Sequence, residues 1–92
     1  MNEHSVPVLY HKNISLQSAQ MLHQFFQAVA DKFAAAEEKH QWKDEWRNIK
    51  DEEELFMKAC KKHLEKGDPI DVCIYLAIMH YYDWGTIGVL AP

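Results

Sequence analysis

Glycine, cysteine and arginine are scarce in this sequence. Three glycines among 92 residues leave no glycine-rich loop of the kind that cradles phosphate groups. The two cysteines, Cys60 and Cys73, form no CxxC pair, and both fall in stretches of helical periodicity, which favours free thiols in a reducing compartment. No signal peptide or N-terminal apolar segment accompanies them, so we expect a protein of the cytoplasm.

Charge and hydropathy are those of a small globular domain. The chain has 10 basic and 14 acidic residues, a net charge of −4, and nine of its ten basic residues are lysine. Nucleic-acid-binding domains usually carry a positive excess rich in arginine, so we expect no direct binding to duplex nucleic acid. The longest apolar run, residues 72–79, is far shorter than the ~20 residues that cross a bilayer, and we expect no membrane contact. With 92 residues, the chain is predicted to form one domain.

Helical periodicity begins at Ser15. The preceding residues 1–14 contain Pro7 and a short β-favouring patch, and we expect an extended arm there. Over residues 15–41, glutamines line one side of a helical wheel and apolar residues the other, which predicts one long amphipathic helix with Ser15 as its N-cap. Its predicted buried face consists of Ala19, Leu22, Phe25, Phe26, Val29, Ala30, Phe33 and Ala36.

A second helix is predicted after a polar connector at residues 42–50. Asp51, with Glu54 three residues later, has the spacing of a capping box, which predicts a helix over residues 51–66. Gly67 is well placed to end it. Its predicted buried face consists of Leu55, Phe56, Ala59, Cys60, His63 and Leu64.

The pair Asp68-Pro69 is the start signal of a third helix, with Asp68 as N-cap and Pro69 at the first helical position. We expect this helix over residues 69–84, ended by Gly85 and followed by an apolar tail at 85–92. Its sequence is apolar around the whole circumference, which predicts the central element of the domain. The predicted fold is therefore all-α, a small three-helix domain made of a long N-terminal helix and a helical hairpin, with an extended N-terminal arm.

Histidine and cysteine offer two chemical possibilities. Glu37 and His40 have the i, i+3 spacing of carboxylate-bridged di-iron bundles, which also need a second such motif on a facing helix. Cys60 and His63 lie one turn apart, but both are predicted to point inward, where a thiol is inert. We interpret these histidines as packed or capping residues, and we predict no metal ion and no cofactor.

Four acidic residues form two pairs with i, i+3 spacing. The pairs are Asp51 with Glu54 and Asp68 with Asp71. They resemble the ExxE and ExxD motifs of MazG-like all-α nucleotide pyrophosphohydrolases, and the DVCIYLAIM stretch is similar to the helix after the second motif of that family. The resemblance implies that the four acids bind Mg²⁺, which orients a triphosphate and an attacking water. Helix capping also accounts for all four residues, so this catalytic function is kept as an alternative.

A KGDPxDVxxY stretch at residues 66–75 lies within a string, residues 42–86, that has tryptophan near both ends. This string resembles small helical proteins encoded by tailed phages and prophages, to which no activity is assigned. The resemblance implies an accessory protein that acts in the cytoplasm of a bacterial host. Small proteins of that kind often bind and inhibit a host enzyme or a defence complex.

Large aromatic side chains are the candidates for a partner surface, because they bury much area at little entropic cost. The predicted partner-binding residues are Trp42, Trp46, Arg47, Tyr81, Tyr82 and Trp84. We interpret the chain as a non-enzymatic phage or prophage accessory protein that binds a host protein, such as a nuclease or a defence complex, and inhibits it. A further alternative is a homo-oligomer, formed by self-association through the glutamine stripe of the long helix.

Overall fold

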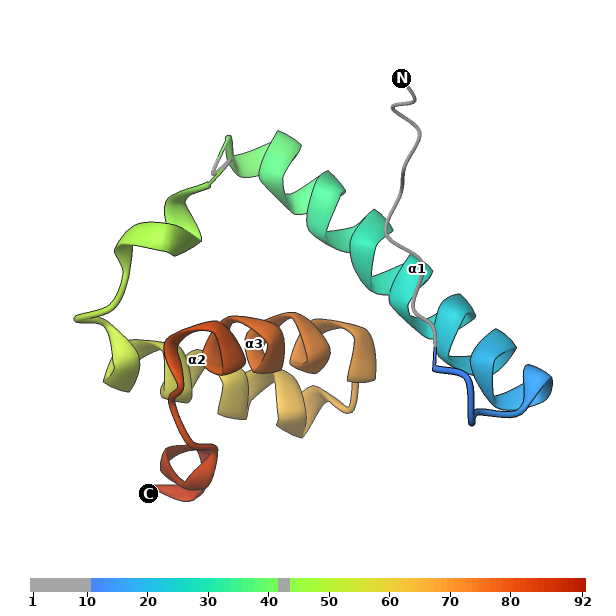
Figure 1. Cartoon of the computed structure of the whole chain (residues 1–92). Coiled ribbons are helices and arrows are strands. Elements are labelled where there is room, and N and C mark those ends of the chain that lie inside the picture. The colour runs from blue at the N-terminus through green and yellow to red at the C-terminus, as the bar shows by residue number, and fades with distance from the viewer. Residues whose placement is uncertain (1–10, 42–43) are drawn as a thin grey trace.

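The computed structural model describes residues 11–41 and 44–92. Its elements are α1 Leu16–His40, η2 Glu45–Asn48, α2 Glu53–Lys66, α3 Pro69–Tyr82 and η3 Ile87–Leu90, where η marks a single 3-10 turn (Figure 1). No strand occurs in the described residues, so the predicted all-α fold is confirmed. Most of the predicted extended arm, residues 1–10, lies outside them. Residues 11–14 form a turn rather than an extended segment, because the Ile14 amide donates to the carbonyl oxygen of His11 at 3.0 Å.

Two of the predicted helix starts form as expected. The Ser18 amide donates to Ser15 Oγ at 3.1 Å, and the Ile70 amide donates to Asp68 Oδ1 at 2.9 Å. Pro69 is at the first position of α3, and Gly67, with φ of 80°, ends α2 in the left-handed conformation that glycine adopts without strain. These signals act over three or four residues, which is why the sequence alone predicts them.

The predicted capping box at Asp51 does not form. Instead, α2 begins at Glu53, and Glu52 takes the N-cap position without a side-chain hydrogen bond. The cause is a tertiary contact. The Glu52 amide donates to the Ile49 carbonyl oxygen at 2.9 Å, and the Ile49 amide donates to the hydroxyl of Tyr82 at 3.1 Å. A turn anchored on α3 therefore decides where α2 begins.

The predicted end of the third helix is also wrong, because α3 stops at Tyr82 and not next to Gly85. Asp83 adopts a left-handed φ of 59°, and its amide donates to the carbonyl oxygen of His80. The Trp84 amide donates to the Met79 carbonyl oxygen at 2.9 Å, which completes a Schellman motif. This early end turns Trp84 back onto the core, and aspartate tolerates the left-handed region better than most residues.

The core lies between α2, α3 and η3. It consists of Met57, Cys60, Met79 and Val89, with Val72, Tyr75 and Trp84 packed against it. Because α3 contacts both α1 and α2, the prediction of a central third helix is confirmed. The predicted buried face of α2 is wrong at Leu55 and Leu64, which are 63% and 50% exposed. Met57 is buried instead, because the apolar tail folds back as η3 and covers that side of α2.

The long helix α1 crosses the hairpin of α2 and α3 obliquely (Figure 1). Of its predicted buried face, only Val29 is buried, and Phe26 and Ala30 are exposed. The reason is a mismatch in length, since the 25 residues of α1 span about 37 Å and the 14 residues of α3 about 21 Å. The N-terminal half of α1 extends beyond the hairpin turn, and its C-terminal half diverges from α3.

Candidate functional site

An open cleft lies between the C-terminal half of α1, η2 and the hairpin. Its volume is about 630 Å³, which is within the range of protein binding pockets. Its apolar lining residues are Phe33, Ala35, Ala36, Trp46, Ile49, Leu55, Phe56, Ala59, Ile74, Tyr75 and Ile78. The charged lining residues Lys39, Glu45 and Glu52 are exposed and form its rim. Apolar side chains of four elements therefore meet solvent on one concave surface.

Two polar contacts at opposite ends of α3 hold the walls of the cleft. At the start of α3, Lys32 Nζ lies 3.2 Å from Asp68 Oδ2 and 3.0 Å from Asp71 Oδ1. At its last residue, the Tyr82 hydroxyl donates to the Trp46 carbonyl oxygen and accepts the Ile49 amide. These two ends of α3 are about 20 Å apart, and the cleft opens between them.

The Lys32 end of the cleft is polar, and its charges compensate one another. The hydrogen bonds that Lys32 donates to Asp71 and Asp68 raise the pKa of Lys32, and the bond from Lys32 lowers the pKa of Asp68. His63 Nδ1 lies 3.3 Å from Asp71 Oδ2, close enough for an ion pair when protonated but without hydrogen-bond geometry. Burial raises the pKa of Tyr75, with a smaller contribution from the charge of Asp71. The remainder of the cleft floor is apolar.

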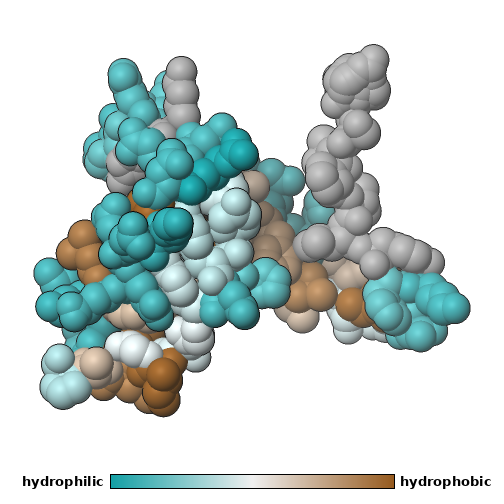
Figure 2. Space-filling model, turned by 60° about the vertical axis from the view of Figure 1, so that its left-hand side comes forward, coloured by the Kyte–Doolittle hydropathy of each residue, from teal (hydrophilic) through white to brown (hydrophobic). Residues whose placement is uncertain are grey.

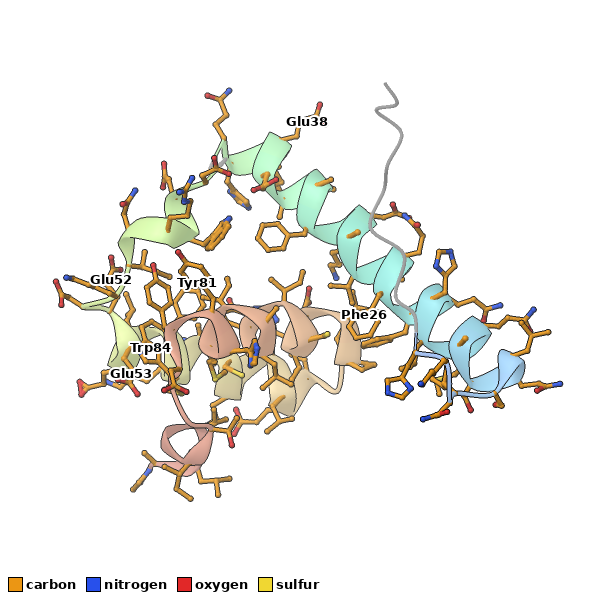
Figure 3. The ribbon with its side chains drawn as sticks, in the orientation of Figure 1. Phe26, Glu38, Glu52, Glu53, Tyr81 and Trp84 are labelled. Carbon is orange, nitrogen blue, oxygen red and sulfur yellow. The ribbon has the colours of Figure 1, made fainter. Side chains whose placement is uncertain are left out.

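Four of the six predicted partner-binding residues form one aromatic row at the η2 end of the cleft. The ring centroids of Trp46 and Tyr81 are 4.9 Å apart, and those of Tyr81 and Tyr82 are 5.0 Å apart. The rings of Tyr82 and Trp84 are stacked at 4.7 Å. Figure 3 shows Tyr81 and Trp84 together at this end of the hairpin. Trp46 lines the cleft and Tyr81 is exposed, whereas the half-buried Tyr82 and Trp84 hold η2 and the end of α3 in place.

The structure does not place the other two predicted residues in the cleft. Arg47 is exposed, does not line the cleft, and lies in an ion pair with Asp44 at 4.0 Å. Trp42 lies outside the described residues.

The four acids of the predicted magnesium site lie in two separate places. Asp51 and Glu54 are exposed at the start of α2, whereas Asp68 and Asp71 are at the start of α3, so the length of α2, about 20 Å, separates the pairs. Asp68 and Asp71 are in addition bound to Lys32. In the part of the chain that the structure describes, no group of three or more His, Cys, Asp or Glu side chains is arranged to hold a metal ion.

The predicted inward orientation of Cys60 is confirmed. Its side chain is 1% exposed, and burial raises the pKa of its thiol, which keeps the thiol unreactive. His63 is half-buried and faces Asp71. The other predicted pair, Glu37 and His40, is at the C-terminal end of α1, where His40 lines the cleft.

Several of the cleft residues were predicted to lie in the core. Phe33 and Ala36 belong to the predicted buried face of the first helix, and Phe56 and Ala59 to that of the second. All four are half-buried and line the cleft. The periodicity of a sequence shows which side of a helix is apolar, but it does not show how far that side lies from the neighbouring helix. No sequence signal therefore separates an apolar face that is packed from one that lines a cleft.

Comparisons with protein-family models, with curated proteins and with solved structures find no match to this chain. None of the described helices combines the length and the apolar character needed to cross a membrane. The cleft is the feature from which a function can be argued.

Proposed function

We propose that this chain is a non-enzymatic binding protein whose cleft takes up an amphipathic helix of a partner protein. The observation that carries the proposal is the cleft of about 630 Å³, lined by apolar and aromatic side chains and open to solvent. Covering such a surface is favourable by roughly 25 cal/mol per Å² of apolar area removed from water. A helix suits a groove between helices, because its side chains at i, i+3, i+4 and i+7 form one apolar stripe.

The rim of the cleft indicates the polar side of the occupant. Lys39 stands on the α1 side of the rim, and Glu45 and Glu52 stand on the η2 side. A complementary helix carries acidic residues on the flank that faces α1 and basic residues toward η2. Its apolar stripe consists of leucine, isoleucine, methionine or phenylalanine, which fill the cleft without burying a charge.

The resemblance of residues 42–86 to small phage and prophage proteins supports a setting for this binding. In this proposal the chain acts in the cytoplasm of a bacterial host, and the helix belongs to a host protein such as a nuclease or a component of a defence complex. Binding inhibits the host protein, because a helix held in the cleft can no longer make the contacts that it makes within the host protein.

Two alanines on α1 supply a matched pair of variants for the test. Ala36 lines the cleft, whereas Ala34 is exposed and outside the lining. The probe is a displayed library of amphipathic helices of about 14 residues, long enough to span the ~20 Å between the two ends of α3. We expect the wild-type chain to select peptides that carry an apolar stripe. The Ala36→Trp variant should bind the selected peptides about tenfold or more weakly, because its side chain fills part of the cleft. The Ala34→Trp variant should bind them as the wild-type chain does.

Failure of the library to yield an amphipathic sequence would overturn the proposed function. Equal binding of the selected peptides by the Ala36→Trp and Ala34→Trp variants would do the same, because it would place the peptides elsewhere on the surface. The inhibitory part of the proposal is wrong if a host protein that contains a selected helix keeps its full activity when saturated with the chain.

A further inference from the structure

The N-terminal half of α1 carries a second apolar surface, separate from the cleft. Residues 16–28 extend beyond the hairpin turn, because Lys32 is already level with the first residues of α3 (Figure 1). Leu16 and Met21, on the two flanks of this segment, are 68% and 58% exposed, Phe26 is 40% exposed, and Leu22 and Phe25 are half-buried. Leu22, Phe25 and Phe26 lie on the same face of α1 as the buried Val29, one to two turns nearer the N-terminus. Figure 3 shows Phe26 where α1 passes the end of the hairpin.

This surface has an unusual distribution of charge. Residues 13–30 contain no aspartate, glutamate, lysine or arginine, whereas the rest of the chain carries 14 acidic and 10 basic residues. Anionic membranes and nucleic acids attract basic side chains, which this segment lacks. Two copies of a chain with a net charge of −4 repel each other over most of their surfaces, but they can approach here without bringing like charges together.

The segment is complementary to itself in an antiparallel arrangement. With Leu22 at the two-fold axis, Phe25 of one copy meets Ala19 of the other, and Phe26 meets Ser18. Each large ring therefore faces a small residue. In this register residue 28 of the second copy lies opposite residue 16 of the first, so the hairpins of the two copies lie toward opposite ends of the contact.

We propose that residues 16–28 form a two-fold symmetric, antiparallel contact with the same residues of a second copy of this chain. This contact uses the apolar face of α1 rather than its glutamine stripe, and it is independent of the cleft. Each segment is about 20 Å long and a helix is about 10 Å wide, so the contact covers a footprint of roughly 200 Å² on each copy. That is smaller than the interfaces of stable dimers, and we therefore expect a weak, reversible dimer.

Sedimentation velocity over a range of chain concentrations tests the contact. We expect the wild-type chain to shift from monomer to dimer as its concentration rises. Leu22→Glu and Leu22→Lys each place like charges at the axis, and each should raise the dissociation constant by about tenfold or more. An equimolar mixture of the two variants should dimerise again, because opposite charges then meet. The control Gln24→Glu adds a charge to the opposite face of the same helix and should dimerise as wild type does.

A Leu22→Cys variant tests the same axis without adding a charge. Its thiols should oxidise to a disulfide-linked dimer, which Gln24→Cys should not form at a comparable rate. The dimer is wrong if the wild-type chain stays monomeric, if the Glu and Lys variants do not associate on mixing, or if the two cysteine variants cross-link equally. Helical circular dichroism confirms that each variant is folded. Failure here leaves the peptide binding of the cleft unaffected, because the two surfaces share no residue.

Discussion

Tyr82 is the side chain that does most to shape the cleft. Its hydroxyl accepts the Ile49 amide at 3.1 Å and donates to the carbonyl oxygen of Trp46, so one side chain satisfies two backbone groups of the connector. Its ring is stacked on Trp84 at 4.7 Å. Backbone groups that lack a partner are costly in a partly buried site, and Tyr82 therefore fixes η2 at the end of the cleft.

Lys32 holds the other end, and its contribution is expected to depend on pH. The hydrogen bond from Lys32 lowers the pKa of Asp68 in the folded chain. The ion pair therefore stabilises the fold fully above the ordinary aspartate pKa of about 3.9, and this stabilisation is lost as the pH falls through the pKa that Asp68 has in the folded chain. The pKa of Lys32 is raised in the folded chain. Its contribution to stability is therefore fully present below the ordinary lysine pKa of about 10.4 and is lost as the pH rises through the pKa that Lys32 has in the folded chain.

The variant Lys32→Met removes both ion pairs and keeps the aliphatic stem. We expect its melting temperature to be lower than that of the wild-type chain by a constant amount at neutral pH, and the difference to disappear as the pH falls from about 4 to about 2. Thermal unfolding followed by circular dichroism in a pH series measures this. Lys58→Met, at an exposed site on α2, is the control. A pH-independent difference for Lys32→Met would contradict the role of the ion pairs.

The four-residue turn η3 completes the core. Val89 is buried against Met57 and Cys60, and Lys61 Nζ donates to the Ala91 carbonyl oxygen at 2.9 Å. A methyl group at Gly88 would lie 3.2 Å from Met57 Cγ, so the backbone of η3 passes close to α2. In contrast, Ile87 and Leu90 remain exposed, and η3 forms the apolar patch at the lower edge of Figure 2.

Deletion of residues 87–92 should expose the thiol of Cys60. We expect labelling of Cys60 by a thiol reagent, measured in a Cys73→Ser background, to become at least about tenfold faster than in the full chain, because burial raises the pKa of this thiol and shields it. The free energy of unfolding should fall by about 1.5 kcal/mol or more through the loss of Val89. The double variant Ile87→Ala and Leu90→Ala, which alters only exposed side chains of η3, should leave Cys60 protected. Unchanged labelling after the deletion would show that η3 does not cover α2.

The whole molecule consists of a packed part and a loosely held helix. Four of the six buried side chains among the described residues form the core of α2, α3 and η3, and α1 contributes only Val29. Few buried contacts give a segment a low free energy of local opening. The cleft is the consequence of this unequal packing. Lys32 ties α1 to the start of α3, whereas at the other end Tyr82 binds the connector after α1 and not α1 itself.

Hydrogen exchange should reveal the same division. We expect the amides of α3 to exchange slowest and those of residues 16–28 to exchange fastest among the helices, when measured at a chain concentration below the dissociation constant of the proposed dimer. At higher concentration the protection of residues 16–28 should rise while that of α3 stays constant. Equal protection of α1 and α3 in the dilute chain would contradict the loosely held helix.

Local signals predicted the elements of the fold, and tertiary contacts decided where some of them end. Ser15, Asp68 and Gly67 act through bonds to residues two to four positions away, and each takes its expected role. Asp51 and Gly85 offer equally good local signals, but Tyr82 overrides the first through its bond to Ile49, and Trp84 overrides the second by packing on Phe56 and the core. Trp46, Tyr81, Tyr82 and Trp84 come together in one aromatic row, and their role in binding a partner stays a prediction.

The sequence by itself determined that this chain is helical, which residues begin its helices, and which side of each helix is apolar. Those properties depend on backbone preferences and on a repeat of 3.6 residues. Only the tertiary structure decided which apolar faces are covered. The hairpin is too short to cover α1. Lys32 binds α1 to the start of α3, Tyr82 binds the connector to the end of α3, and the apolar surface between these two contacts is left open as the cleft.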